Sequence, residues 1–198
     1  MSITINLREL IDFDPAQDAH FRKSAEILAL AVNHPDFLPR VLTAPYRETY
    51  FRPAVGSRIS KTPAEVVQII NDGLERGTLA DGTIDIAIRQ DPTIDAPVVG
   101  STTPGKLLWR TSSWFIEKST SRSDTISPAR HMIHEWLHVA GFMHKRQNGY
   151  RKDVAYLVGD IVRQILTELA AQKSDASIHE DPVVSAALDR SLEHIGED

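Results

Sequence analysis

Cysteine is absent from the chain, and no apolar run is longer than six residues, the stretch at 27–32. Without cysteine the protein forms no disulfide, thiolate zinc finger, iron–sulfur cluster or catalytic thiol, so a bound metal must use His, Asp, Glu or Tyr. A membrane-spanning helix needs roughly 20 apolar residues, which is far more than this run offers. We therefore expect neither a thiol-based site nor a membrane span.

Basic side chains are too few and too scattered for a nucleic-acid interface. The 198 residues carry 22 Lys and Arg against 27 Asp and Glu, for a formal net charge of -5, and no basic stripe alternates with aromatics. The start of the chain lacks a basic segment followed by an apolar one, so we predict no signal peptide. We expect a cytoplasmic protein, or one exported after leader removal or by a leaderless route. The shares of 41% hydrophobic and 25% charged residues are those of a globular domain.

Four residue pairs combine a helix-capping residue with a following proline, which favours the first turn of a helix. They are Asp14–Pro15, Thr62–Pro63, Ser127–Pro128 and Asp181–Pro182. With the apolar spacing that follows, they predict helices over 16–33, from 62 to Gly73 or Gly77, from 127 onward, and over 182–193. Apolar residues at 154–169 also recur at helical spacing and predict another long helix.

Alternation of apolar and polar residues predicts the strands. The clearest case is 83–89, where Ile84, Ile86 and Ile88 alternate with polar or small residues, as in a half-buried strand. Weaker patterns predict strands at 3–7, 98–102 and 112–117. Helices and strands mixed in this order indicate a single α/β (α+β) domain.

One stretch carries a metal-binding pattern, His-Glu-x-x-His-x-x-Gly-x-x-His at 134–144. His134 and His138 are four residues apart, so on a helix both imidazoles face one side and can bind a single ion at about 2.1 Å. Gly141 falls where the helix must end, and glycine readily takes the left-handed conformation that returns His144 as a third ligand. Glu135 lies about 100° around the helix, where it can reach a metal-bound water as a general base.

Three protein ligands with an open fourth position are typical of a catalytic zinc, whereas a structural zinc is closed by four. The alternative is that these histidines are ordinary polar residues of an amphipathic helix. Chance agreement at all five motif positions is on the order of one in ten thousand, which disfavours that alternative. We therefore predict one zinc ion per chain, bound by His134, His138 and His144.

In this motif the chain resembles the metzincin clan of zinc metallopeptidases. The resemblance implies that the three histidines bind zinc, that Glu135 polarises the water, and that Gly141 separates an upper from a lower subdomain. It also implies a zincin fold with a twisted mixed sheet, a backing helix, an active-site helix and a small, mainly helical lower part. The corresponding division is a catalytic domain at 1–172, with its upper part to about 141 and its lower part from about 142, and an acidic appendage at 173–198.

The chain departs from the clan in one respect, because metzincins carry a methionine in a turn beneath the metal, after the third histidine. The methionines of this chain are Met1, Met132 and Met143, and none of them follows His144. In several metzincins this turn reads Met-x-Tyr, and the counterpart here is Val154-Ala155-Tyr156. We hypothesise that Val154 takes the methionine position and that Tyr156 is a fifth ligand or a hydrogen-bond donor to the oxyanion. The alternative is that Tyr156 only packs at the start of the last long helix.

Three further residues have weaker signals. His131, three residues before His134, is predicted to face solvent, with a place beside the metal ligands as the alternative. Either Asp124 or Asp153 can orient a ligating imidazole through its second ring nitrogen, and the sequence does not choose between them.

Together these features predict a zinc-dependent metalloendopeptidase that hydrolyses a peptide or protein substrate, with Glu135 activating the zinc-bound water. We expect the substrate to lie extended along an edge strand of the sheet. Two alternatives share the same residues: a zinc hydrolase of a non-peptide amide, and a non-catalytic zinc-containing binding module. Retention of Glu135 argues against the binding module, because a structural site needs no base.

Overall fold

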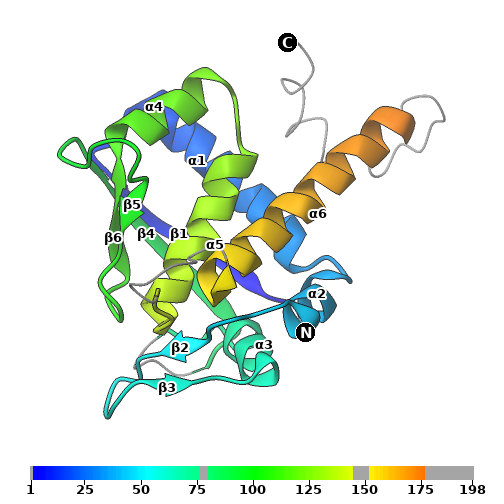
Figure 1. Ribbon diagram of the computed structural model, residues 1–198. Coiled ribbons are helices and arrows are strands. Elements are labelled where there is room, and N and C mark those ends of the chain that lie inside the picture. Colours follow the sequence, from blue (N-terminus) through cyan, green and yellow to red (C-terminus); the bar gives the residue numbers. More distant parts are fainter. Residues whose placement is uncertain (1, 76–79, 145–151, 177–198) are drawn as a thin grey trace.

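The computed structural model describes residues 2–75, 80–144 and 152–176, which form a mixed α/β structure (Figure 1). In chain order its elements are β1 (Thr4–Ile11), α1 (Pro15–Val32), α2 (Phe37–Thr43), β2 (Tyr50–Phe51), β3 (Ile59–Ser60), α3 (Pro63–Asn71), β4 (Thr83–Asp91), β5 (Gly100–Ser101), β6 (Leu108–Ser112), α4 (Ser113–Ser121), α5 (Ile126–Ala140) and α6 (Val154–Ala176). One sheet has the strand order β1-β4-β6-β5, and β2 pairs with β3 in a small separate ribbon. The α/β class predicted from the sequence is confirmed.

The main sheet is mostly parallel. Strands β1, β4 and β6 run in the same direction, while β5 pairs antiparallel with β6 and forms one edge. The strand predicted at 83–89 is confirmed as β4, but the half-buried pattern is wrong, because Asp85 and Ala87 are buried as well as the three isoleucines. Asn6 and Arg8 of β1 cover this second face and donate hydrogen bonds to the Asp85 carboxylate.

Helices α1 and α3 begin where the capping pairs predict. The Asp14 carboxylate accepts from the backbone N–H of Gln17 at 2.8 Å, and the Gln17 side chain accepts in return from the Asp14 N–H at 3.1 Å. Thr62 and Glu65 form the same reciprocal pair at the start of α3. Each pair satisfies backbone donors that a helix start otherwise leaves without partners, so the helix predicted at 16–33 is confirmed as α1.

The strand predicted at 112–117 is wrong. Helix α4 occupies most of this stretch, and the strand lies just before it, as β6. Trp114, Phe115 and Ile116 form a short apolar run that fits either structure by pattern alone. The core decides for a helix, because Ile116 and Ser119, three residues apart, are both buried. Helix α2 and the ribbon of β2 and β3 were not predicted either, since their apolar patterns are too short to recognise.

Helix α5 is enclosed by the rest of the protein and packs against both α1 and α6 (Figure 1). From Pro128 to Ala140 its residues are buried except Arg130. The helix begins at Ile126, and the Asp124 carboxylate accepts from the Ser127 N–H at 3.0 Å. The metal-binding pattern therefore lies on a helix whose position is fixed by packing on several sides.

Helix α6 confirms the prediction at 154–169 and continues to Ala176, across the boundary predicted at 172. It approaches α5 closely at Gly159, where a Cβ atom would lie 3.3 Å from Cγ of Arg130 and 3.8 Å from Cβ of His134. No helix in the described part of the chain is long and apolar enough to cross a membrane. The helix predicted at 182–193 and the appendage beyond residue 176 lie outside the described residues.

Candidate metal centre

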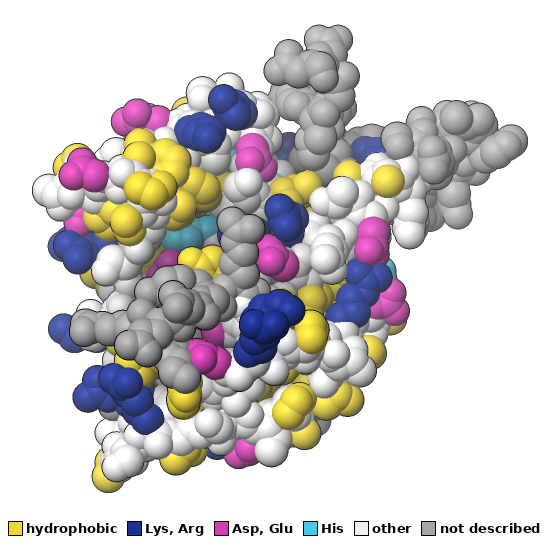
Figure 2. Space-filling view, in the orientation of Figure 1, with side chains coloured by type: hydrophobic (Ala, Val, Ile, Leu, Met, Phe, Trp, Pro, Cys, Tyr) yellow, Lys and Arg dark blue, Asp and Glu magenta, His cyan; other side chains and the backbone are white. Residues whose placement is uncertain are grey.

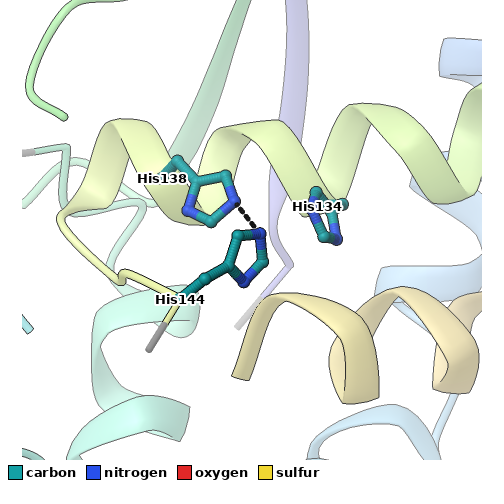
Figure 3. Close-up of side chains that lie close together, drawn as sticks. All are labelled: His134, His138 and His144. Atoms are coloured by element: carbon teal, nitrogen blue, oxygen red, sulfur yellow. Dashed lines mark hydrogen bonds between the residues drawn. The ribbon is translucent and has the colours of Figure 1, made fainter. Parts of the chain in front are cut away.

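The three histidines of the motif lie together, although only two of them belong to α5 (Figure 3). His134 and His138 are one turn apart, with ring centroids at 5.0 Å. Gly141 ends the helix with a φ of 125°, a conformation that L side chains rarely adopt. The chain then turns against β2, where the Met143 N–H donates to the Tyr50 carbonyl at 3.0 Å. This turn returns His144 to the side of the helix that carries His134 and His138.

The cluster has the dimensions of a metal site. Nε2 of His138 lies 3.0 Å from Nε2 of His144, as the dashed line in Figure 3 marks. One nitrogen from each of the three rings can be chosen so that all lie within 4.8 Å of one another. Two nitrogens that bind one tetrahedral ion at about 2.1 Å are about 3.4 Å apart, and the His138–His144 distance is close to this value. His134, His138 and His144 could therefore hold a metal ion.

The protonation of the cluster also suits a metal. Burial and, to a smaller extent, the neighbouring histidines keep the pKa of His134 well below its usual value, and burial lowers the pKa of His138 to about 4. Both imidazoles are therefore neutral near pH 7, which is the form that binds metals. Among the described residues, the buried Nδ1 of His134 has no hydrogen-bond partner. The neutral imidazoles of His134 and His138, one of them with a buried nitrogen that has no hydrogen-bond partner, are suited to bind a cation.

The second nitrogens of two of these rings are held by neighbours. Nδ1 of His138 lies 2.8 Å from the Phe142 carbonyl oxygen, and Nδ1 of His144 lies 2.6 Å from Oδ2 of Asp153. Partners of this kind fix the tautomer and aim Nε2 at the centre of the cluster. Of the two acids that the sequence left open, Asp153 contacts His144, whereas the Asp124 carboxylate accepts from the Ser127 N–H in the first turn of α5.

Tyr156, the candidate fifth ligand or oxyanion donor, packs against the cluster. Its ring centroid lies 4.7 Å from that of His134 and 5.0 Å from that of His144. The Tyr156 N–H donates to Oδ1 of Asp153 at 3.1 Å, so the acid that contacts His144 also positions this residue. Val154, the first residue of α6, is buried, and its equivalence to the metzincin methionine stays a prediction.

Glu135 is buried beside the cluster, with an exposed fraction of 5%. The hydroxyl of Thr102, just after β5, donates to its Oε2, and Nδ1 of His131 lies 3.6 Å from its Oε1. Burial raises the pKa of Glu135 to about 7, although the Thr102 hydrogen bond acts in the opposite direction. A carboxyl group of this kind can take up and release a proton near neutral pH.

His131 does not face solvent, so that prediction is wrong. Its exposed fraction is 5%, and Nε2 lies 3.0 Å from the Thr111 hydroxyl. Gly100 of β5 makes room for it, because a Cβ there would lie 2.6 Å from Cε1 of His131. His131 precedes Glu135 by four residues, and this spacing was a usable signal for their contact. Thr102 and Thr111 were missed because they are far from the motif in sequence.

A cavity of about 700 Å³ lies beside the cluster. Its walls include His134, Glu135 and Tyr156, together with the edge strand β5. Figure 2 shows histidine side chains in a hollow on this face of the molecule, with hydrophobic side chains gathered beside it. The cluster is therefore accessible to a molecule larger than a metal ion.

Comparison with known proteins gives no independent assignment of this site. No protein-family model matches the chain, and neither curated proteins nor solved structures gave a significant match. The functional conclusion therefore rests on the residues and the geometry described above.

Proposed function

We propose that this protein is a zinc-dependent metalloendopeptidase of metzincin type. One observation carries the proposal: three clustered imidazoles and a buried carboxyl group from the same motif border one cavity. A site that only binds metal for stability has no use for Glu135 beside the cavity, whereas hydrolysis requires such a base.

The residues of the chain have distinct roles in this proposal. His134, His138 and His144 would hold zinc, which supplies Lewis acidity toward a carbonyl oxygen and toward water. Glu135 accepts a proton from the attacking water and delivers it to the leaving amine nitrogen. The Thr102 hydroxyl holds the Glu135 carboxylate by a hydrogen bond to Oε2, and the His131 ring lies near Oε1. Tyr156, whose ring contacts two of the histidines, would donate a hydrogen bond to the oxyanion.

The edge strand β5 supports a peptide as the substrate. It pairs with β6 on one side only, and Gly100 and Ser101 line the cavity. An extended peptide can add to such an edge through main-chain hydrogen bonds, with its scissile bond beside the histidines. The mixed sheet, the helix α1 behind it and the buried helix α5 are also the elements that the resemblance to metzincins implies.

The test is the metal content of the purified protein by mass spectrometry, with cleavage of a mixed peptide library by wild type and Glu135→Ala. We expect about one zinc per chain, cleavage that a chelator abolishes, and no cleavage by the variant. Glu117→Ala, on the exposed face of α4, is the matched control and should cleave normally. Zinc without cleavage would refute the peptidase and favour a non-peptide amide or a binding module, and absence of metal would refute the proposal entirely.

A further inference from the structure

The cavity extends beyond the histidines along α5, toward the start of that helix. Arg130 lines it there, four residues before His134 and on the same side of α5. Four residues advance a helix by about 6 Å, so the stem of Arg130 begins about one turn from the first histidine. Arg163 of α6 lines the cavity as well.

A single carboxylate contacts both arginines. Nε of Arg130 lies 3.0 Å from Oδ1 of Asp160, and Nη2 of Arg163 lies 3.4 Å from the same oxygen. In the described part of the chain, Asp160 is the only acid in contact with either guanidinium. Arg40, by comparison, contacts the carboxylates of two acids. These two guanidinium groups and the one carboxylate together carry one net positive charge.

The positive side of this group faces the cavity. Arg130 and Arg163 are among the residues that line it, whereas Asp160 is not. The one other Asp, Glu, Lys or Arg side chain in the described lining is Glu135, which accepts a hydrogen bond from the Thr102 hydroxyl. Each guanidinium has five N–H donors, and the contacts with Asp160 use only part of them. The cavity thus offers charged donors whose acid partner, Asp160, does not line it.

We propose that Arg130 and Arg163 form a subsite for a substrate carboxylate close to the scissile bond. The proposal rests on the function proposed above and adds a preference for acidic substrates. An extended peptide advances about 3.3 Å per residue, so a distance of about 6 Å corresponds to about two residues. The carboxylate is the side chain of Asp or Glu within two residues of the cleaved bond, or the C-terminal carboxylate of a short substrate.

The test uses matched peptides that contain Glu or Gln within two residues of the cleavage site, each with a free or an amidated C-terminus. Cleavage is measured as kcat/KM, and binding of fluorescent peptides is measured by anisotropy with zinc-loaded Glu135→Ala. We expect wild type to prefer the acidic peptide by about 10- to 100-fold, as a charged hydrogen-bonded pair provides. The double variant Arg130→Gln, Arg163→Gln should lose this preference, whereas the control Arg22→Gln, on α1, should keep it.

A variant with the opposite effect guards against misfolding of the double variant. Asp160→Asn keeps an oxygen acceptor for Arg130 but removes the competing negative charge. Added to the zinc-loaded Glu135→Ala protein, it should therefore make binding of the acidic peptide tighter than in Glu135→Ala alone. If replacing Glu by Gln in the peptide lowers kcat/KM, the subsite binds the side-chain carboxylate. If amidation of the peptide lowers kcat/KM, the subsite binds the C-terminal carboxylate. Either result supports the subsite.

The results separate the two proposals. Cleavage of acidic and neutral peptides at equal rates would overturn the subsite while leaving the peptidase intact. Arginine-dependent binding of acidic peptides without any cleavage would support the subsite and overturn the peptidase. An equal loss of preference in Arg22→Gln would indicate a general charge effect and would overturn the subsite.

Discussion

Asp153 is expected to determine zinc affinity although it is not a predicted ligand. Its two carboxylate oxygens have separate partners: Oδ2 contacts Nδ1 of His144 at 2.6 Å, and Oδ1 accepts from the Tyr156 N–H at 3.1 Å. The first contact keeps the proton of His144 on Nδ1, so that Nε2 can bind metal. The second caps α6, because Tyr156 is the third residue of that helix.

Substitution of Asp153 can separate these two roles. In Asp153→Asn the amide oxygen can still cap α6, but the NH2 group then faces His144 and favours the tautomer that cannot bind metal at Nε2. Loss of such a partner weakens metal affinity by about 10- to 100-fold, or about 1.4–2.7 kcal/mol. Asp153→Ala removes the cap as well and should lower the free energy of unfolding of the metal-free protein by about a further 0.5–2 kcal/mol relative to Asn.

The assay is competition for zinc with a chromophoric chelator, with urea unfolding of the metal-free variants alongside. Asp124→Asn is the matched control, because the Asp124 carboxylate also accepts from a backbone N–H in the first turn of a helix but contacts no histidine of the cluster in the described structure. Its zinc affinity should equal that of wild type. Zinc binding by Asp153→Asn as tight as that of wild type would refute the argument that Asp153 orients His144.

Three other predictions concern pH, the helix end and the oxyanion. Burial lowers the pKa of His131 from 6.5 to about 3, so the native metal-free protein binds fewer protons there than the unfolded chain. His131 alone should lower the unfolding free energy by up to about 1.4 kcal/mol for each pH unit below 6.5, and His131→Asn should make the measured slope shallower in urea titrations. Gly141→Ala should destabilise the protein more than Gly56→Ala. Both glycines have positive φ, but only a Cβ at position 141 would approach another part of the chain, 2.9 Å from the Arg52 carbonyl oxygen. Equal free energies of unfolding for the two variants in urea would contradict this prediction. Tyr156→Phe should lower kcat by about 10²- to 10³-fold with zinc affinity unchanged, and normal turnover would exclude the oxyanion role.

Helices α1, α3, α5 and α6 could be predicted because their signals are local. The starts of α1 and α3 depend on residues three apart, and the long apolar face of α6 repeats over several turns. By contrast, α4 and the two faces of β4 depend on what packs against them. The run at Trp114 is a helix because of the core beneath it, and Asp85 is buried because Asn6 and Arg8 lie across from it on β1. Such partners are distant in sequence and leave no local pattern.

The same distinction applies to the site. Helical spacing predicts the positions of His134, Glu135 and His138. Gly141 indicates the turn that returns His144. The groups that orient these residues come from other elements. Thr102 lies 33 positions from Glu135, and only the fold shows which of the candidate acids is beside His144. The sequence therefore predicted the group of three histidines that could hold a metal ion, but not the contacts that orient these rings and Glu135.

Helix α5 places different chemistry at successive turns of one face. Ser127, Arg130, His134 and His138 recur at spacings of three or four residues, and all of them line the cavity. Each turn advances about 5.4 Å, which is close to two residues of an extended peptide. A peptide along β5 would therefore meet the histidines at its scissile bond and the earlier turns of α5 with its neighbouring residues. Because Ser127 and Arg130 belong to other turns than the histidines, we expect under the proposed function that substitutions there change peptide preference and leave zinc affinity unchanged.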